Sequence, residues 1–263
     1  LQIPAEFPPH VLHEAEQAVA AGPKVPAGAA AEILDARDIA FVTIDPPGST
    51  DLDQAFAARR SRAGYIVSYA IADVAAFIVP GGSIDGEARA RGLTLYSPDR
   101  RTSLHPEVIS EDAGSLLAGC ERQALLWTIE LDAAGALREA RVERALVRNR
   151  CQLSYREAQK LAASAGSDEP VGLLREIGEL RLALEAERGA VSLALASQAV
   201  VRGNDGSYDI EYDETLPVEQ WNAQISLLTG IAASRIMIDG GVGILRTLPE
   251  PDPRTIGRLR RTA

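Results

Sequence analysis

The chain has 263 residues, 46% hydrophobic and 24% charged, which is typical of a globular protein with one large or two small domains. Its formal net charge of −10 argues against broad binding of duplex nucleic acid but permits RNA in a local channel. No apolar run approaches the length of a membrane span and no secretory signal is evident, so no membrane association is expected. The spacing of Cys120 and Cys151 fits no metal site and favours a reduced, cytoplasmic protein.

The N-terminal region predicts a short helix over residues 8–21, entered through two prolines. A stretch containing Pro and Gly follows from Gly22 to Gly28 and predicts a linker. We therefore expect residues 1–30 to form an N-terminal helix and linker, and residues 31–263 to form the main domain.

An acidic stretch, residues 41–56, is the most informative part of the chain. A predicted strand, Phe41–Asp45, ends in a carboxylate, and a Pro-Pro-Gly turn leads to Asp51 and Asp53 on either side of Leu52. Carboxylates held this close repel one another unless a cation lies between them, and Mg²⁺ prefers oxygen ligands. The stretch predicts a magnesium site that handles a phosphodiester. A polar surface loop is an equally weighted alternative, and the EF-hand spacing is missing.

Strands are expected next at residues 55–60 and 64–73, followed by a short helix at 83–91. Asp73 ends the second strand. It is expected either to contribute to the acidic site beside Asp45 or to act as a turn or capping aspartate.

The rest of the chain changes from strands to helices. Residues 124–131 and 136–153 predict a hairpin of long strands, and Ser154 with Glu157 predicts a capping box. Helices are then expected at 169–188, 217–239 and 251–263, with a strand pair at 198–202 and 208–212. This order predicts an α+β fold with a mixed, largely antiparallel sheet flanked by helices.

Several segments closely resemble the RNB catalytic domain of the ribonuclease II and ribonuclease R family. The resemblance is carried, in the family's order, by residues 38–45, 49–55, 69–74, 95–96, 104–106, 152–158, 187–189 and 222–235. It implies an RNB-like fold and processive hydrolysis of single-stranded RNA from the 3′ end. It also implies release of nucleoside 5′-monophosphates and dependence on Mg²⁺, with Mn²⁺ as a possible substitute.

The resemblance also implies roles for individual residues. Asp45, Asp51 and Asp53 would hold the metal and the scissile phosphate. Tyr96 would stack on the terminal base. The remaining substrate contacts implied are Gln54, Asp73 and Gln224, of which Gln224 lies near a position that often holds a glutamate in the family.

Two departures from the family pattern support an alternative. Gln54 stands where the family usually has a fourth acid, and no Ser-Pro-Ile-Arg-like stretch occurs before Ala263. The chain is therefore expected to cover the first half to two-thirds of an RNB domain. The alternative from another functional class is a non-catalytic RNA-binding fragment or scaffold. A weaker third option is a magnesium-dependent phosphatase acting on small molecules. The pattern does not indicate an oligomeric state.

Overall fold

The computed structural model describes residues 6–25, 33–97, 100–164, 166, 169–190, 197–203, 205–213, 215–245, 247 and 249–262. In this part of the chain, six strands form the central sheet. They are Leu34–Asp35 (β1), Phe41–Asp45 (β2), Gln54–Ser61 (β3), Gly64–Ala72 (β4), Glu121–Asp132 (β7) and Leu137–Ser154 (β8).

The central sheet closes into a ring because β8 pairs with β2 and also with β7, the last strand of the order, while β1 pairs with β8 as well. The strand order is β1-β8-β2-β3-β4-β7, and β7 also pairs with β8. The first part of this 18-residue strand pairs antiparallel with β7, and its last part pairs parallel with β2. Apart from β1 and β2 on β8, the pairings in this sheet are antiparallel. The predicted largely antiparallel sheet is thus confirmed.

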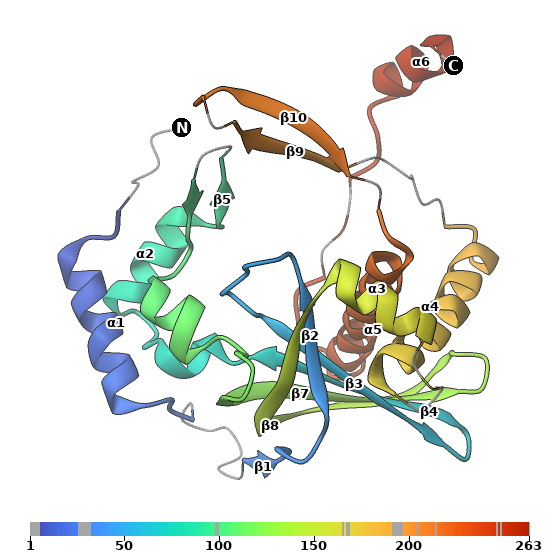
Figure 1. Ribbon diagram of the computed structural model, residues 1–263, viewed down its shortest axis with the longest axis horizontal. Helices are drawn as coiled ribbons and strands as arrows, with labels where there is room; N and C mark the ends of the chain where they lie inside the picture. The colour runs from blue at the N-terminus through green and yellow to red at the C-terminus, as the bar shows by residue number, and fades with distance from the viewer. Residues whose placement is uncertain are drawn as a thin grey trace.

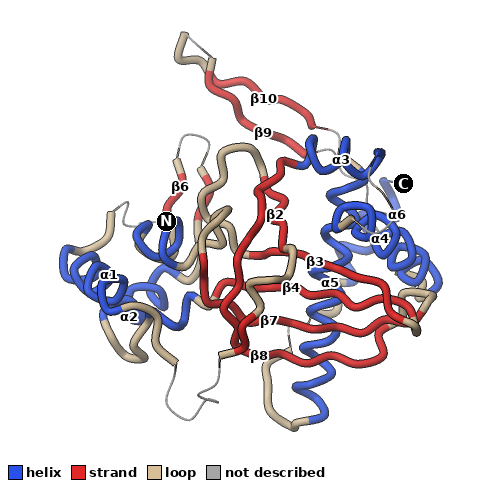
Figure 2. The backbone as a smooth tube through the Cα atoms, turned by 60° about the horizontal axis from the view of Figure 1, so that its bottom comes forward, coloured by secondary structure: helices blue, strands red, loops and turns tan. Residues whose placement is uncertain are grey.

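Three helices cover one side of the ring (Figures 1 and 2). They are Tyr155–Ser164 (α3), Pro170–Glu187 (α4) and Pro217–Asp239 (α5). Their apolar side chains join those of the sheet in one core, which includes Phe56, Ile129, Ile177 and Ile225. α4 and α5 approach closely at Gly178, where an added Cβ would lie 2.4 Å from Cβ of Trp221. The regularly spaced apolar side chains of these helices therefore pack against the sheet.

The opposite side of the ring carries the N-terminal helix Pro9–Ala21 (α1) and Ser83–Arg91 (α2), as both views show. Two single-turn helices, Val74–Phe77 (η1) and Val108–Ala113 (η2), complete this layer. Val11 and Ala15 of α1 pack in the same cluster as Phe77, Ile84 and Ile109. The predicted N-terminal helix is thus confirmed and is part of the same packed body.

Two hairpins and a last helix lie outside these layers. They are Leu95–Tyr96 (β5) with Arg101–Thr102 (β6), Ser197–Arg202 (β9) with Tyr208–Asp213 (β10), and Pro253–Thr262 (α6). The β9–β10 hairpin projects from the body on the side that carries β5 and β6 (Figures 1 and 2). None of the helices in the described residues has the length and apolar character needed to cross a membrane.

Candidate active site

Hydrogen bonds between the side chain of Ser115 and the backbone hold the acidic loop between β2 and β3 in place. Gly48 adopts φ +82°, a conformation that side chains disfavour, and lets the chain turn after the two prolines. Ser115 Oγ donates to the carbonyl of Thr50 and accepts from the amide of Leu52, at 2.7 and 2.9 Å. Leu52 is fully buried. Because the loop is anchored at Leu52, Asp51 and Asp53 on either side of it have defined positions, as the alternating pattern predicted.

Asp45 and Asp53 are two acids of the site whose pKa is raised. Burial, together with the charges of Asp53 and Asp51, raises the pKa of Asp45 from 3.8 to about 6. Burial and the charge of Asp51 raise the pKa of Asp53, and Arg101 partly opposes this. Asp45 Oδ2 is buried without a hydrogen-bond partner. The mutual influence of these carboxylates shows that the fold brings them together.

Asp51 is oriented differently from the other two. Its Oδ2 accepts a hydrogen bond from Nη1 of Arg101 at 2.7 Å. Nη2 of the same guanidinium donates to Glu111, which also accepts from the hydroxyl of Thr50. Among the described residues, no three His, Cys, Asp or Glu side chains are arranged to hold a metal ion. The described residues thus do not present the three aspartates as one metal-binding group, and Asp51 is paired with Arg101 instead.

A pocket of about 430 Å³ opens beside Asp45. Its polar lining comes from the sheet and from α3 and α5, and consists of Asp45, Gln54, Tyr69, Tyr155, Glu219, Asn222 and Ser226. The carbonyl of Gln54 accepts hydrogen bonds from the hydroxyls of Tyr69 and Ser226, and these two hydroxyls lie 2.9 Å apart. Gln54 therefore lines the pocket, with its carbonyl oxygen already bonded within the protein, and its predicted contact with substrate stays a prediction.

The two tyrosine hydroxyls of this pocket remain protonated at neutral pH. Burial is the main cause that raises the pKa of Tyr69 to about 12. Burial and the charge of Asp45 raise the pKa of Tyr155, whose hydroxyl also has a hydrogen bond with Asn222. A protonated hydroxyl next to a carboxylate can donate to phosphate or ribose oxygens.

The acidic site fits a divalent cation. Asp45 has an unpartnered buried oxygen, and its pKa is raised mainly by burial and further by the charges of Asp53 and Asp51. The pKa of Asp53 is also raised, although the charge of Arg101 partly opposes the shift. A hard cation bound by carboxylate oxygens would partner the buried oxygen of Asp45 and would offset the repulsion between the carboxylates. The donors present thus suit Mg²⁺ or Mn²⁺, with Asp45 and Asp53 as the ligands that are ready to bind.

Tyr96 occupies the surface position that base stacking needs. It lies on β5 directly across from Arg101 on β6, and its side chain is 76% exposed. An exposed aromatic ring provides a face on which any base can stack. The structure is compatible with the predicted role, which remains a prediction.

Asp73 does not join the acidic site, which corrects one of the two expectations for it. It is 3% exposed and its Oδ2 accepts from Nε of Arg144 at 3.0 Å. Its carbonyl accepts from the amide of Ala76 at the start of η1. Because an arginine of β8 neutralises it, Asp73 has a structural role as a paired turn aspartate.

Gln224 also differs from its predicted role. It is 5% exposed and its amide nitrogen donates to Glu185 of α4. The pocket is lined instead by Asn222, Ala223 and Ser226 of the same helix. Since successive residues of a helix are about 100° apart, the face that meets the pocket excludes position 224. The prediction that Gln224 contacts the terminal nucleotide is not supported.

Sequence reasoning missed several residues of the site. These are Tyr69, Glu111, Tyr155, Glu219 and Ser226. Tyr155 follows the predicted capping box, which is confirmed by reciprocal hydrogen bonds between Ser154 and Glu157. Tyr155 lies within the segment 152–158 that carries the family resemblance, and in the structure it directly follows β8, whose end pairs with β2.

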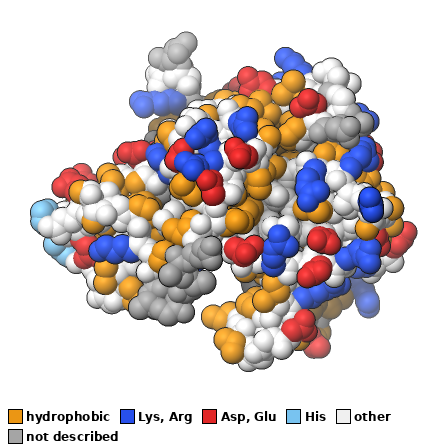
Figure 3. Space-filling model, turned by 90° about the horizontal axis from the view of Figure 1, so that it is seen from below, with side chains coloured by type: hydrophobic (Ala, Val, Ile, Leu, Met, Phe, Trp, Pro, Cys, Tyr) orange, Lys and Arg blue, Asp and Glu red, His pale blue; other side chains and the backbone are white. Residues whose placement is uncertain are grey.

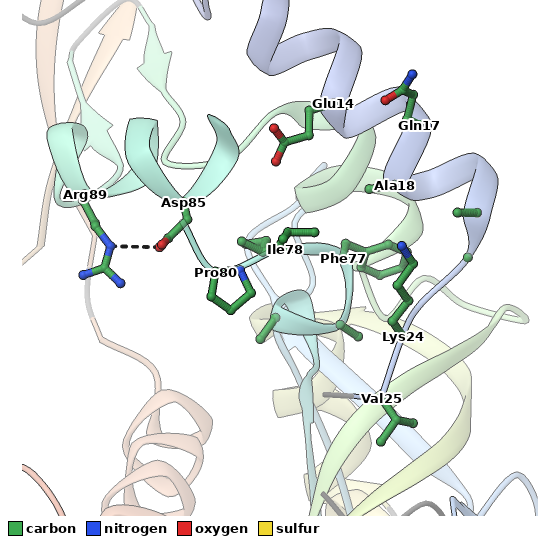
Figure 4. Close-up of a pocket in the computed structure, with 15 residues that line it drawn as sticks. Glu14, Gln17, Ala18, Lys24, Val25, Phe77, Ile78, Pro80, Asp85 and Arg89 are labelled. Carbon is green, nitrogen blue, oxygen red and sulfur yellow. Dashed lines mark hydrogen bonds and ion pairs between the residues drawn. The ribbon is translucent and has the colours of Figure 1, made fainter. Parts of the chain in front are cut away.

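A larger cavity of about 920 Å³ lies elsewhere, between α1 and the segment from η1 to α2. Figure 4 shows it lined largely by apolar side chains such as Phe77 and Ile78, with the Asp85–Arg89 ion pair at its edge. It contains none of the three acids, so its size does not make it the catalytic candidate.

Charge on the surface is mixed. On the face seen in Figure 3, Lys and Arg side chains are interspersed with Asp and Glu and with apolar residues. This face presents no continuous basic surface, so attraction of a phosphate chain there depends on individual cations.

Comparison with known proteins identifies the family of this chain. Residues 33–263 match the family model of the RNB domain. The chain is 28% identical over 241 residues to the exosome complex exonuclease RRP44 of Mus musculus, covering 87% of this chain and 25% of that protein. It is 38% identical over 130 residues to the inactive exonuclease DIS3L2 of Arabidopsis thaliana, covering 48% of this chain and 12% of that protein.

A solved structure shares the fold. The Mycoplasma genitalium RNase R in complex with ribose methylated single-stranded RNA superimposes with a TM-score of 0.87 at 20% identity. The match covers 99% of this chain and 42% of that structure. The chain thus spans about a quarter or less of the two curated relatives and under half of the solved structure.

Proposed function

The chain belongs to the RNB domain family, and from this premise we propose that it hydrolyses single-stranded RNA from the 3′ end. The products would be nucleoside 5′-monophosphates, and the reaction would depend on Mg²⁺. The observation that carries the proposal is Asp45, a strand-end carboxylate with an unpartnered buried oxygen beside a pocket of nucleotide size.

In this proposal Asp45, Asp51 and Asp53 hold the metal. A bound Mg²⁺ supplies positive charge to the scissile phosphate and lowers the pKa of an attacking water. The protein's own part is to position the phosphate. The hydroxyl of Tyr155 lies in the pocket next to Asp45 and donates to an oxygen of the terminal nucleotide.

Exposed aromatic and apolar side chains support RNA as the substrate. Tyr96 is 76% exposed on β5. Tyr208, Ile210 and Tyr212 alternate along β10 and are each more than half exposed. Side chains two apart on a strand share one face, so β10 presents an apolar ladder on the projecting hairpin. Such rings stack on successive bases without regard to sequence.

The direct test uses RNA carrying a 5′ label. The chain with Mg²⁺ should give a ladder that shortens from the 3′ end, and chromatography should identify nucleoside 5′-monophosphates as products. Chelation of the metal or the Asp53→Asn substitution should abolish the ladder. Shortening from the 5′ end, or equal cleavage of small phosphate esters and long RNA, would contradict the proposal. The second outcome would favour the small-molecule phosphatase.

A non-catalytic RNA-binding role is the second candidate. It is favoured by Gln54, a neutral residue whose carbonyl is bonded to Tyr69 and Ser226 rather than available to a metal. Retained binding of labelled RNA without any metal-dependent shortening would establish this candidate over the first.

A further inference from the structure

Arg101 links two parts of the candidate site. It lies on β6 opposite Tyr96, and its guanidinium reaches the acidic loop. Nη1 donates to Asp51 and Nη2 donates to Glu111. The side chains of Arg101, Asp51 and Glu111 are exposed by 27%, 28% and 20%, so all three are partly shielded from solvent. The pairing is therefore stronger than a fully exposed ion pair.

This pairing divides the acids into two kinds. Asp51 is neutralised by a cation of the protein, whereas Asp45 retains an unpartnered oxygen. A divalent cation at Asp45 and Asp53 would attract the carboxylate of Asp51 as a further ligand. Because Oδ2 of Asp51 accepts from Arg101, a metal that takes this oxygen, or both oxygens of the carboxylate, competes with the guanidinium.

We propose that Arg101 is a positioning residue that is exchanged between Asp51 and the RNA backbone. When metal binds, Asp51 turns to it, and Arg101 stays anchored by Glu111 with one edge of its guanidinium released. That edge meets a phosphate of the RNA whose base stacks on Tyr96, the residue across the hairpin from Arg101. An arginine presents donors on two edges and can hold a carboxylate with one and a phosphate with the other.

The exchange couples metal binding to RNA binding. Before metal binds, Arg101 stabilises Asp51 and so opposes metal. After metal binds, Arg101 contributes to RNA affinity. The inference rests on the metal site of the proposed function, but it predicts effects of opposite sign that this site alone does not require.

The first measurement is a titration with Mn²⁺ followed by electron paramagnetic resonance, without RNA or turnover. We expect Arg101→Gln to bind Mn²⁺ about three- to tenfold more tightly than the unmodified chain, because a competing cation is removed. Arg89→Gln is the matched control, since Arg89 pairs with Asp85 on α2 and does not contact the acids. Its Mn²⁺ affinity should be unchanged.

The second measurement is fluorescence anisotropy with an RNA that carries 3′-terminal phosphorothioate linkages to slow hydrolysis. With saturating Mn²⁺, Arg101→Gln should bind this RNA about fivefold more weakly. The slope of log affinity against log salt concentration should fall by about one, because one phosphate contact is lost. The RNA affinity of Arg101→Lys should lie between those of the unmodified chain and Arg101→Gln, because lysine keeps the charge but cannot donate from two edges.

The outcomes separate the inference from the function on which it rests. Tighter Mn²⁺ binding together with weaker RNA binding supports the exchange. Unchanged or weaker Mn²⁺ binding by Arg101→Gln overturns it, as does unchanged RNA binding. If the unmodified chain binds no Mn²⁺ at all, the proposed metal site fails, and the inference fails with it.

Discussion

Two aspartates of this chain occupy similar places and do different things. Asp45 is the last residue of β2, and Asp73 directly follows β4. Asp73 is 3% exposed and paired with Arg144, whereas Asp45 is partly buried among other acids with one oxygen unpartnered. A buried carboxylate with a partner holds the fold together, while one without a partner weakens the fold and is suited to bind a cation.

The comparison predicts opposite effects of the same substitution at the two positions. Removing the charge of Asp45 should lower activity and raise stability, because the repulsion between the acids is reduced. Removing the charge of Asp73 should harm stability because a partly buried arginine loses its partner. Four measurements sharpen or break this contrast.

The largest effect is expected on catalysis at Asp45. Asp45→Asn should lower kcat/KM for RNA at least about a hundredfold, because loss of a metal ligand removes charge stabilisation of several kcal/mol. The rate of nucleotide release under saturating Mg²⁺ measures this. Asp73→Asn, assayed well below its unfolding temperature, is the control and should keep most of the activity. Activity of Asp45→Asn within threefold of the unmodified chain would remove Asp45 from the site.

The next effect is on stability at Asp73. Asp73→Asn should lower the free energy of unfolding by about 2–4 kcal/mol, because it leaves Arg144 partly buried and unpaired. Urea denaturation measures the change, and a double-mutant cycle with Arg144→Gln isolates the pair. A loss below about 0.5 kcal/mol, or no coupling in the cycle, would show that the ion pair is not what stabilises this strand end.

Substrate binding at Tyr96 should follow. Tyr96→Ala should weaken binding of single-stranded RNA by about 1–3 kcal/mol, because a stacking surface is lost. Tyr96→Phe keeps the ring and should bind nearly as well. Since Tyr96 is 76% exposed, neither variant should change the unfolding temperature. Equal affinities of the Ala and Phe variants would exclude stacking, and anisotropy with labelled RNA distinguishes them.

The smallest effect is the pH dependence of stability at Asp45. Its folded-state pKa is raised from 3.8 to about 6, so its protonated form is favoured on folding. The stability from this group is present in acid and is lost as pH rises from about 4 through about 6. Asn carries no charge at any pH. Asp45→Asn should therefore gain about 1–2 kcal/mol over the unmodified chain across this window, after allowance for solvent screening.

Metal should reverse that gain. Saturating Mg²⁺ stabilises the folded form that binds it, and so should raise the stability of the unmodified chain but not that of Asp45→Asn. Urea midpoints at pH 5 and pH 7.5, with and without Mg²⁺, test both parts. A difference in unfolding free energy between the two proteins that does not change with pH would mean that ionisation of Asp45 does not destabilise the fold.

Local patterns determined the elements of this protein. The helix predicted over residues 217–239 has those bounds in the structure, and the capping box at Ser154 is present. Strands lie on either side of the acidic loop and Leu52 is buried, as predicted, although the first four residues of β2 are all buried rather than alternately exposed. Periodicity, turns and caps depend on near neighbours in the chain, and these can be read directly from the residues.

Only the tertiary structure decided which polar groups meet. Arg101 and Asp51 are separated by 50 residues in the chain, and Arg144 and Asp73 by 71. The same holds for Gln224, whose helix was predicted but whose direction depends on how α5 packs on α4 at Gly178. A carboxylate becomes a structural or a functional group according to the cation beside it, and that cation is supplied by a distant strand which local sequence does not specify.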